Sequence, residues 1–82
     1  MADDAAKVSI VVFLKPGVLD VQGKALQGAL HGLGWPGVAD VRVGRVITLT
    51  LPDPATAEAE ARAMCDRLLA NAVIERYNVS VS

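Results

Sequence analysis

The fold of this chain is decided by the segment KVSIVVFLK, which occupies residues 7–15. Its even-numbered positions are all apolar, and the odd-numbered positions between them are Ser9, Val11 and Phe13. Successive side chains of a strand point to opposite faces of the sheet, so this pattern predicts a strand with apolar groups on both faces. Pro16 has no N–H group to offer a sheet ladder and ends the strand.

A helix is expected soon after this strand, over residues 21–33. Asp20 has a side chain that can cap the exposed amides of a first helical turn, and leucine and alanine then recur at helical spacing. Gly23 and Gly28 each cost about 1 kcal/mol relative to alanine inside a helix. Their presence predicts that another backbone segment lies close to that side of the helix.

Two further segments, residues 38–43 and 46–51, alternate around Gly44. Apolar residues occupy the odd positions of both segments. A hairpin places them on one face only if the numbers of the two residues in each cross-strand pair add up to an even number. A three-residue turn with Gly44 in the left-handed conformation satisfies this condition, and a two-residue turn does not. The opposite face of the second segment carries Val46 and Thr48.

The last part of the chain predicts a second helix and a final strand. Asp53 and Pro54 form a typical helix start, and Asn71 is expected to stop the helix in a left-handed conformation. The apolar stripe expected between them consists of Ala57, Ala61, Met64, Cys65, Leu68 and Leu69. Residues 74–81 alternate again and predict the last strand.

The predicted order is βαββαβ, an α+β two-layer sandwich with a mainly antiparallel sheet of four strands and two helices on one face. All 82 residues fit one domain, in which residues 1–6 are expected to be disordered. The other face of the sheet stays open and carries Val11 and Phe13 beside Val46 and Thr48. Such an apolar and hydroxyl-bearing surface suits packing against another sheet, so dimerisation through the sheet is expected.

The composition also points to a subunit. Hydrophobic residues make up 52% of the chain before its 7 glycines are counted, and mean hydropathy is +0.39. A typical soluble domain reaches about 45–50% with glycine included, and one of this size buries only about 60% of its surface. The surplus is expected to meet other copies of the chain, in a homodimer or tetramer, or a larger partner. A net charge of −1 gives no basis for binding nucleic acid or an anionic membrane.

No arrangement of reactive side chains predicts catalysis by this chain. His31 stands alone and is assigned a helix-end or surface role, and Cys65 lies on the apolar stripe as an inert packing thiol. No residue is assigned to a catalytic, cofactor or metal site, because no cysteine and histidine spacing fits one. The single cysteine cannot form a disulfide within the chain, and neither the acidic N-terminus nor any apolar run resembles a signal peptide. The chain is therefore expected in the cytoplasm.

Several separated motifs resemble one known family over nearly the whole chain, from Val8 to Val81. They are Leu14-Lys15-Pro16-Gly17-Val18-Leu19-Asp20, Gln22-Gly23-Lys24-Ala25, Asp40-Val41-Arg42-Val43-Gly44-Arg45, and Leu68-Leu69-Ala70-Asn71 with Val73-Ile74-Glu75 and Tyr77. In this order and spacing they resemble the PurS subunits of phosphoribosylformylglycinamidine synthase. Three positions depart from the family's usual residues, since Val21 and Ala72 stand where proline is common and Arg45 where lysine is common.

The resemblance implies a non-catalytic adaptor in purine biosynthesis, within a ligase complex. There, a synthetase (PurL) that uses ATP and Mg²⁺ converts formylglycinamide ribonucleotide to the amidine, with ammonia that a glutaminase (PurQ) releases from glutamine. The adaptor bridges these two subunits and assists ammonia transfer. The residues expected at partner interfaces are Val11, Phe13, Lys15, Asp20, Lys24, Arg42, Arg45, Val46, Thr48, Asn71, Glu75 and Tyr77.

Two other classes share the predicted order of elements. An ACT-type regulatory domain binds amino acids at dimer interfaces, and a thermal shift with free amino acids would support it. An acylphosphatase-like hydrolase is suggested by Val21-Gln22-Gly23 at the strand-to-helix loop. The arginine and asparagine of that family's signature are missing, so the remaining tripeptide is a weak motif.

Overall fold

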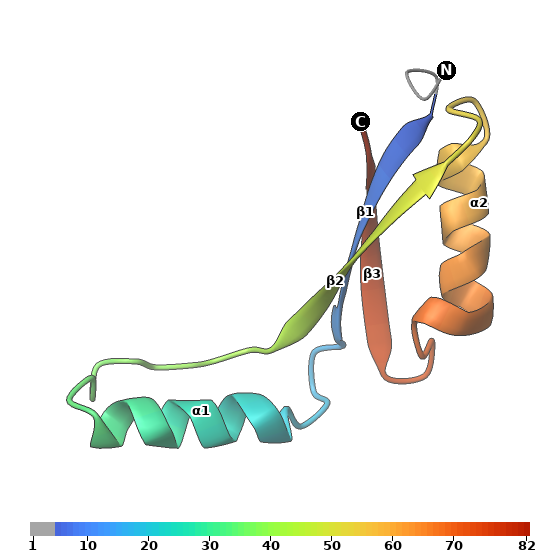
Figure 1. Cartoon of the computed structure of the whole chain (residues 1–82). Helices are drawn as coiled ribbons and strands as arrows, with labels where there is room; N and C mark the ends of the chain where they lie inside the picture. The colour runs from blue at the N-terminus through green and yellow to red at the C-terminus, as the bar shows by residue number, and fades with distance from the viewer. Residues whose placement is uncertain (1–4) are drawn as a thin grey trace.

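The computed structural model describes residues 5–82 (Figure 1). Its elements are β1 (Ala6–Leu14), α1 (Val21–Gly32), β2 (Gly44–Leu51), α2 (Ala57–Met64), the π-helical turn η2 (Cys65–Leu69) and β3 (Glu75–Val81). The predicted first strand, first helix and last strand are confirmed within one or two residues. Disorder of residues 1–6 is wrong for Ala6, which begins β1 and is buried, whereas residues 1–4 lie outside the described residues.

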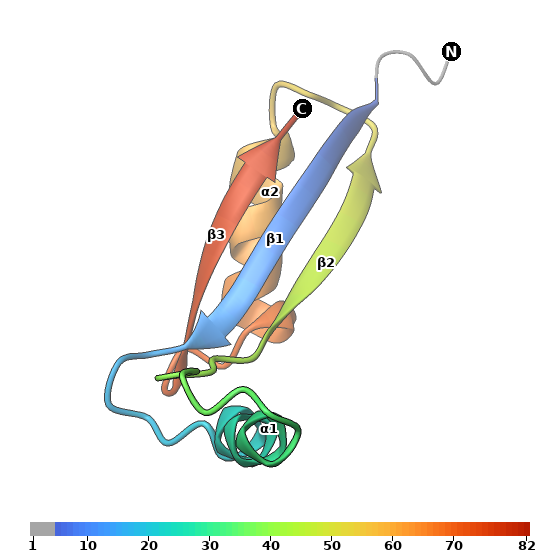
Figure 2. The same ribbon diagram turned by 90° about the vertical axis from the view of Figure 1, so that its left-hand side faces the viewer.

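β1 is the central strand of a three-stranded antiparallel sheet in the order β2-β1-β3 (Figure 2). Val8 lies opposite Leu49 of β2 on one side and opposite Val81 of β3 on the other. The β-branched residues on both faces of β1 suit this central place, because side chains of two neighbouring strands shield them. The segment of residues 7–15, from which the fold was predicted, therefore makes up most of the central strand of the sheet.

The hydrophobic core lies between the sheet and α2. Its fully buried side chains are Ala6, Val8, Ile10, Val12, Ala57, Ala61 and Cys65. Ala57, Ala61 and Cys65 are four residues apart and share one side of the helix, where their small size allows close approach to the sheet. α2 covers one face of the sheet, and no helix of the described part of the chain lies on the opposite face (Figure 2).

Residues 5–82 contain three strands, whereas four were predicted. Residues 38–43 form no strand and run as an extended link from α1 into β2, which begins at Gly44 (Figure 1). The predicted three-residue hairpin is therefore wrong, and Gly44 does not adopt the left-handed conformation. The Val43 N–H donates a 2.7 Å hydrogen bond to the Asp20 carboxylate, which holds the link near the start of α1 instead of folding it back on β2.

The prediction that both helices cover the sheet is also wrong. α1 lies beyond the end of the sheet, and its only buried residue is Gly23 (Figure 1). It packs instead along the extended link, where the Gln27 side-chain amide donates to the Ala39 carbonyl over 3.0 Å. The Cα radius of gyration is 16.5 Å, whereas a compact domain of this length has about 12 Å. The chain is therefore unusually extended for its size.

Gly23 and Gly28, two of the three glycines of α1, have different surroundings. A Cβ atom at Gly23 would overlap the Val41 backbone carbonyl, so the predicted close approach of another backbone is confirmed there. A Cβ atom at Gly28 would have no neighbour within 4 Å, so the same prediction is wrong at that position. Of these two glycines, only Gly23 has a packing reason for its missing side chain.

The second helix begins later than predicted, at Ala57 instead of directly after Asp53. Asp53 caps a preceding turn by accepting a hydrogen bond from the Ala55 N–H over 2.9 Å. The helix then widens, because the Ala70 N–H donates to the Cys65 carbonyl five residues earlier over 3.1 Å. This widening defines η2.

The wider turn changes which side chains face the core. Leu69 packs against the core, whereas Leu68, which was predicted on the same stripe, is 83% exposed. Asn71 does not stop the helix in a left-handed conformation, so that prediction is also wrong. Instead, its side-chain oxygen accepts a 3.0 Å hydrogen bond from the Val73 N–H and shapes the turn into β3.

Candidate interaction surfaces

The sheet face opposite α2, termed the open face, is formed by residues that alternate with the core residues along each strand. It includes Ser9, Val11, Phe13, Val46, Thr48, Thr50, Asn78 and Ser80. The predicted grouping of Val11, Phe13, Val46 and Thr48 on this face is confirmed. Val11 lies directly opposite Val46, and their residues are 40% and 62% exposed. The register also places two charged residues on this face, Lys7 opposite Thr50 and Arg76 opposite Phe13, toward the two ends of β1. Between them, the apolar pair and its hydroxyl and amide neighbours can meet a flat partner surface without burying a charge.

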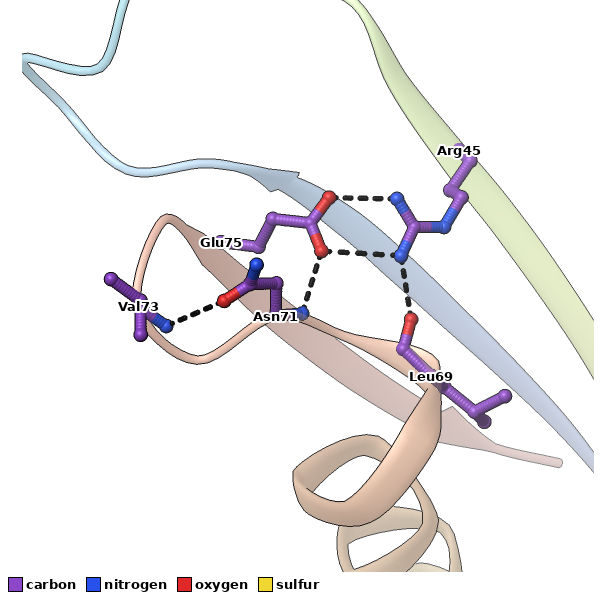
Figure 3. A network of polar contacts seen from close by, with 5 residues as sticks. All are labelled: Arg45, Leu69, Asn71, Val73 and Glu75. Atoms are coloured by element: carbon purple, nitrogen blue, oxygen red, sulfur yellow. Dashed lines mark hydrogen bonds and ion pairs between the residues drawn. The ribbon is translucent and has the colours of Figure 1, made fainter.

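A polar network joins three elements at one end of the sheet (Figure 3). It is termed the Arg45 corner and consists of Arg45, Leu69, Asn71 and Glu75. The Arg45 guanidinium donates to both Glu75 carboxylate oxygens, over 2.7 and 3.2 Å, and to the Leu69 carbonyl over 2.6 Å. The Asn71 N–H donates to the same carboxylate over 2.7 Å. The Arg45 corner thus ties β2 to the end of η2 and to the start of β3.

The charges of the Arg45 corner stabilise each other. The hydrogen bonds from Arg45 and from the Asn71 N–H lower the pKa of the Glu75 carboxyl below its usual value. The same carboxylate raises the pKa of the Arg45 guanidinium. The Glu75 side chain is 13% exposed and that of Arg45 50%, so solvent weakens their attraction.

The arginine at position 45 uses a geometry that lysine lacks. Its planar fork binds one carboxylate through two N–H groups while also reaching the Leu69 carbonyl. A lysine ammonium is a point charge and cannot reproduce this bidentate arrangement. The arginine that stands where the resemblance implies a lysine is therefore held by contacts within the chain.

The Asp20 carboxylate joins α1 to the extended link through two hydrogen bonds. One carboxylate oxygen accepts from the Gly23 N–H over 2.8 Å and the other from the Val43 N–H over 2.7 Å. These two bonds, with Val43 the larger cause, lower the pKa of the Asp20 carboxyl below its usual value. The predicted helix cap is confirmed, and Asp20 is only 5% exposed, which leaves it little surface for a partner.

The other residues expected at interfaces lie in three places. Lys24 and Arg42 line one hollow beside Asp20, on the extended part of the molecule. Lys15 follows β1, and its backbone N–H donates to the Ile74 carbonyl over 2.8 Å. Tyr77 lies on the core side of β3. Its hydroxyl donates to the Asp66 carboxylate over 3.0 Å, which raises the pKa of the phenol. The expected residues therefore form separate groups, not one site.

The reactive side chains within residues 5–82 have structural partners. His31 Nε2 lies 2.8 Å from the Val38 carbonyl, which only accepts, so this nitrogen donates its proton to the link. Cys65 is fully buried, and desolvation raises the pKa of its thiol, which keeps it in the unreactive protonated form. In this part of the chain no three His, Cys, Asp or Glu side chains lie close enough together to hold a metal ion.

Several surface features were missed by sequence reasoning. Leu68 and Val73 are more than three-quarters exposed near the Arg45 corner. Leu68 was predicted on the buried stripe of the second helix, and Val73 was named only within a family motif. The Leu69 carbonyl that binds Arg45 carries no sequence signal, because every residue has a carbonyl. The Asn71-x-x-x-Glu75 spacing is the only local sign of this network, since the Asn71 N–H bonds the Glu75 side chain.

None of the helices in the described residues has the length and apolar character needed to cross a bilayer.

The fold and surfaces are those of a small α+β interaction module. One face of its sheet is open, and its helix α1 lies apart from the sheet. Within the described residues the polar side chains discussed above form hydrogen bonds to other parts of the same chain, and the exposed apolar side chains are spread over the surface.

The chain belongs to the PurS family. The family model described as PurS, phosphoribosylformylglycinamidine (FGAM) synthase, matches residues 7–82. The family assignment from sequence motifs is thereby confirmed.

Curated relatives agree with this assignment. A phosphoribosylformylglycinamidine synthase subunit PurS from Synechocystis sp. is 54% identical over 70 residues, which cover 83% of this chain and 70% of the relative. The subunit of the same name from Bacillus subtilis is 43% identical over 76 residues, covering 92% and 90%.

Solved structures show the same fold. The B. subtilis PurS structure has a TM-score of 0.87 at 42% identity and covers 94% of this chain and 98% of that one. PurS from Methanocaldococcus jannaschii, one of the subunits of formylglycinamide ribonucleotide amidotransferase in the purine biosynthetic pathway, has a TM-score of 0.85 at 33% identity, covering 94% and 95%. A chain in the structure of PurLQS from Thermotoga maritima has a TM-score of 0.83 at 26% identity, covering 95% and 98%.

Proposed function

We propose that this chain is the adaptor subunit of a phosphoribosylformylglycinamidine synthase in purine biosynthesis. It joins the glutaminase subunit to the synthetase subunit and assists the transfer of ammonia between them. The similarity over almost the full chain to a chain of PurLQS from T. maritima carries this proposal. In this role the chain works in the cytoplasm, and its partner synthetase uses ATP and Mg²⁺.

The physical requirements of an adaptor agree with the surfaces described above. Ammonia must pass between subunits without escaping to water, which calls for close-packed, dry contacts instead of a nucleophile. The open face offers an exposed apolar pair, Val11 and Val46, without a central charge. The Arg45 corner keeps the adjoining end of the sheet rigid, because it fixes β2, η2 and β3 to one another.

The adaptor functions as a homo-oligomer in this proposal, and the open face is one of its contact surfaces. Its total accessible surface is 5753 Å², and a compact protein of 8.6 kDa has about 4,700 Å². The excess of roughly 1,000 Å² is similar to the about 800 Å² that each partner buries in a standard interface. A chain with this much additional surface is suited to more than one protein contact.

The experiment that tests the proposal reconstitutes the synthase from the synthetase and glutaminase subunits of the same cell. Amidine formation is measured with glutamine, and separately with a high concentration of ammonium salt, each with and without this chain. The expected result is that glutamine supports the reaction only when the chain is present, whereas free ammonia supports it in both cases. Equal rates from glutamine with and without the chain would refute the adaptor function.

A pair of variants tests whether the open face is used. Val46→Asp places a charge on this face, and Leu68→Asp makes the same kind of change on η2, at a residue that is more exposed still. A carboxylate buried in an apolar contact is costly, so Val46→Asp is expected to lower the glutamine-dependent rate roughly tenfold or more. The Leu68→Asp control should stay within about twofold of the parent. Identical behaviour of the two variants would rule out a contact through Val46.

A further inference from the structure

β3 is an edge strand, and its outer edge has no neighbouring strand among the described residues. β1 pairs with its inner edge from Glu75 to Val81 without a break in the register. Figure 2 shows no other segment running along the outer side of β3. The backbone groups on this side therefore decide what the edge can bind.

The hydrogen-bond pattern shows which backbone groups of β3 point outward. Ser82 and Lys7 exchange both of their backbone hydrogen bonds, over 3.0 and 3.3 Å. Hydrogen-bonded and non-hydrogen-bonded pairs alternate along an antiparallel ladder, so the even-numbered residues of β3 bond to β1. The odd-numbered residues Tyr77, Val79 and Val81 direct their N–H and C=O groups outward. No backbone group of the described loops or helices bonds these outward groups.

This edge lacks the features that usually protect a free strand. Edge strands in natural proteins are commonly shielded by proline, by a bulge or by charged side chains. β3 contains no proline, its register with β1 has no bulge, and no charged residue follows Arg76. An unprotected edge of this kind is a template for another extended segment.

A hollow of about 380 Å³ adjoins the start of this edge. It is lined by residues 75–78 of β3, whose side chains alternate between the two faces of the sheet, so the hollow reaches around the outer edge of the strand. Ala70 and Ala72 also line it and are too small to fill it. The hollow therefore has room for a side chain of an added segment. Such a side-chain pocket gives specificity to a contact made mainly by backbone.

The charges around the hollow favour an acidic side chain. Its two carboxylates, Asp66 and Glu75, already accept hydrogen bonds from other side chains. Of its two cations, Arg62 has its Nε 3.5 Å from the Glu58 carboxylate, whereas Arg76 is exposed and forms no ion pair within the described chain. An opposite charge directly across from Arg76 on a neighbouring strand would be stabilising.

We propose that β3 accepts an added strand from a partner subunit of the synthase. An extended segment of about five residues pairs with the outward groups of residues 77–81, and an acidic side chain of this segment lies opposite Arg76. Main-chain hydrogen bonds supply the affinity of such a contact. The strand addition rests on the proposed adaptor function, because the segment belongs to the synthetase or to the glutaminase subunit.

A second copy of β3 does not supply this acidic side chain. The only acidic residue of β3 is Glu75, and its carboxylate is already held by Arg45 and by the Asn71 N–H. Pairing of β3 with its own copy would leave Arg76 without a free carboxylate opposite it. A segment of a different subunit is therefore the better occupant of this edge.

Amide hydrogen exchange, read residue by residue, tests the added strand. The full chain is measured alone, with the synthetase, with the glutaminase and in the complete synthase. In the chain alone, the outward N–H groups of Tyr77, Val79 and Val81 should exchange roughly tenfold or more faster than the inward N–H groups of Asn78 and Ser80, which serve as internal controls. In the complex that supplies the strand, the outward groups should slow by roughly tenfold or more, and the inward groups should change little.

Two results of this measurement would overturn the proposal. Outward amides that stay fast in every mixture would mean that no strand is added. Outward amides that are already slow in the chain alone would mean that a second copy, and not a partner subunit, occupies the edge.

A charge reversal tests the acidic side chain. Arg76→Glu should weaken binding of the chain to the subunit that supplies the strand by roughly fivefold or more, because two carboxylates would then lie opposite each other. Arg67→Glu is the matched control, since it makes the same change at an exposed arginine of η2 that has no ion pair in the described chain. Its binding should stay within about twofold of the parent. Both variants are first required to match the parent in circular dichroism and in sedimentation mass. Equal binding of the two variants would contradict an acidic side chain opposite position 76.

Failure of the strand addition is distinguishable from failure of the adaptor function. If the outward amides stay fast but glutamine-dependent amidine formation still requires the chain, only the strand addition is wrong. If these amides become protected but glutamine supports the reaction equally well without the chain, the contact exists and the adaptor function is wrong.

Discussion

Replacing Gly23 with alanine is expected to loosen α1 from the extended link. The added Cβ atom would overlap the Val41 carbonyl and would lie 2.8 Å from the Asp20 carboxylate. The carbonyl belongs to the backbone and cannot turn aside as a flexible side chain can. Gly28→Ala is the matched control, because it makes the same change in the same helix with no atom within 4 Å of the new methyl group.

The magnitude follows from two opposing effects. Overpacking costs about 1–3 kcal/mol, and the upper end applies because the obstacle is backbone. Alanine returns about 1 kcal/mol of helix propensity at either position. The packing of α1 on the link should therefore weaken by about 2 kcal/mol in Gly23→Ala and strengthen by about 1 kcal/mol in Gly28→Ala.

Hydrogen exchange of the Val43 N–H measures this packing directly, because that proton is bonded to Asp20 across the contact. A loss of about 2 kcal/mol corresponds to roughly 30-fold faster exchange, and a gain of about 1 kcal/mol to roughly fivefold slower exchange. The reasoning is refuted if the two variants shift the exchange rate of this amide in the same direction, or if Gly23→Ala leaves it unchanged.

The remaining predictions concern the Arg45 corner and the buried thiol. Because folding lowers the pKa of Glu75 from its usual 4.5, its contribution to stability is present above that pH and is lost as the pH falls through the folded-state pKa. Urea unfolding of Glu75→Gln should therefore show less stability loss than the parent chain when the pH is lowered from 6 to 3, and an identical pH profile would contradict this. Arg45→Lys removes the fork but keeps the charge. It should cost less than about 1 kcal/mol in the same urea assay, since the pair is partly solvated; a larger loss would mean that the Leu69 contact dominates. The Cys65 thiol should react with a thiol reagent only as fast as the chain opens, and rapid labelling of the native protein would disprove its burial.

Local patterns predicted the local elements well. β1 was identifiable because its β-branched residues alternate over a full strand, and the start of α1 because Asp20 has the geometry of a cap. The alternation along each strand also assigned Val11, Phe13, Val46 and Thr48 to the face opposite the core. These features depend on residues close in sequence, where spacing alone determines which side chains share a face.

The features that sequence reasoning missed depend on distant contacts. Residues 38–43 alternate as a strand does, but the pattern does not show whether a partner strand is present, so they were assigned to a hairpin that the structure does not form. No residue type in the sequence signals the π-helical turn η2. Leu68, which lies in this wider turn, is exposed to solvent instead of lying in the predicted core. The bond between Arg45 and Glu75 joins residues 30 positions apart and became visible only from the arrangement of β2 beside the turn into β3.

The central claim is that this chain links ammonia release to ammonia use, and isotope partitioning tests it most directly. The reconstituted synthase is supplied with glutamine labelled with nitrogen-15 in its amide group, in the presence of excess unlabelled ammonium. With the chain present, the amidine product should carry the label well above the isotope ratio of the bulk ammonia, because the released nitrogen passes between the subunits without mixing. A product whose label matches the bulk ratio, with the chain present and glutamine being hydrolysed, would contradict the account.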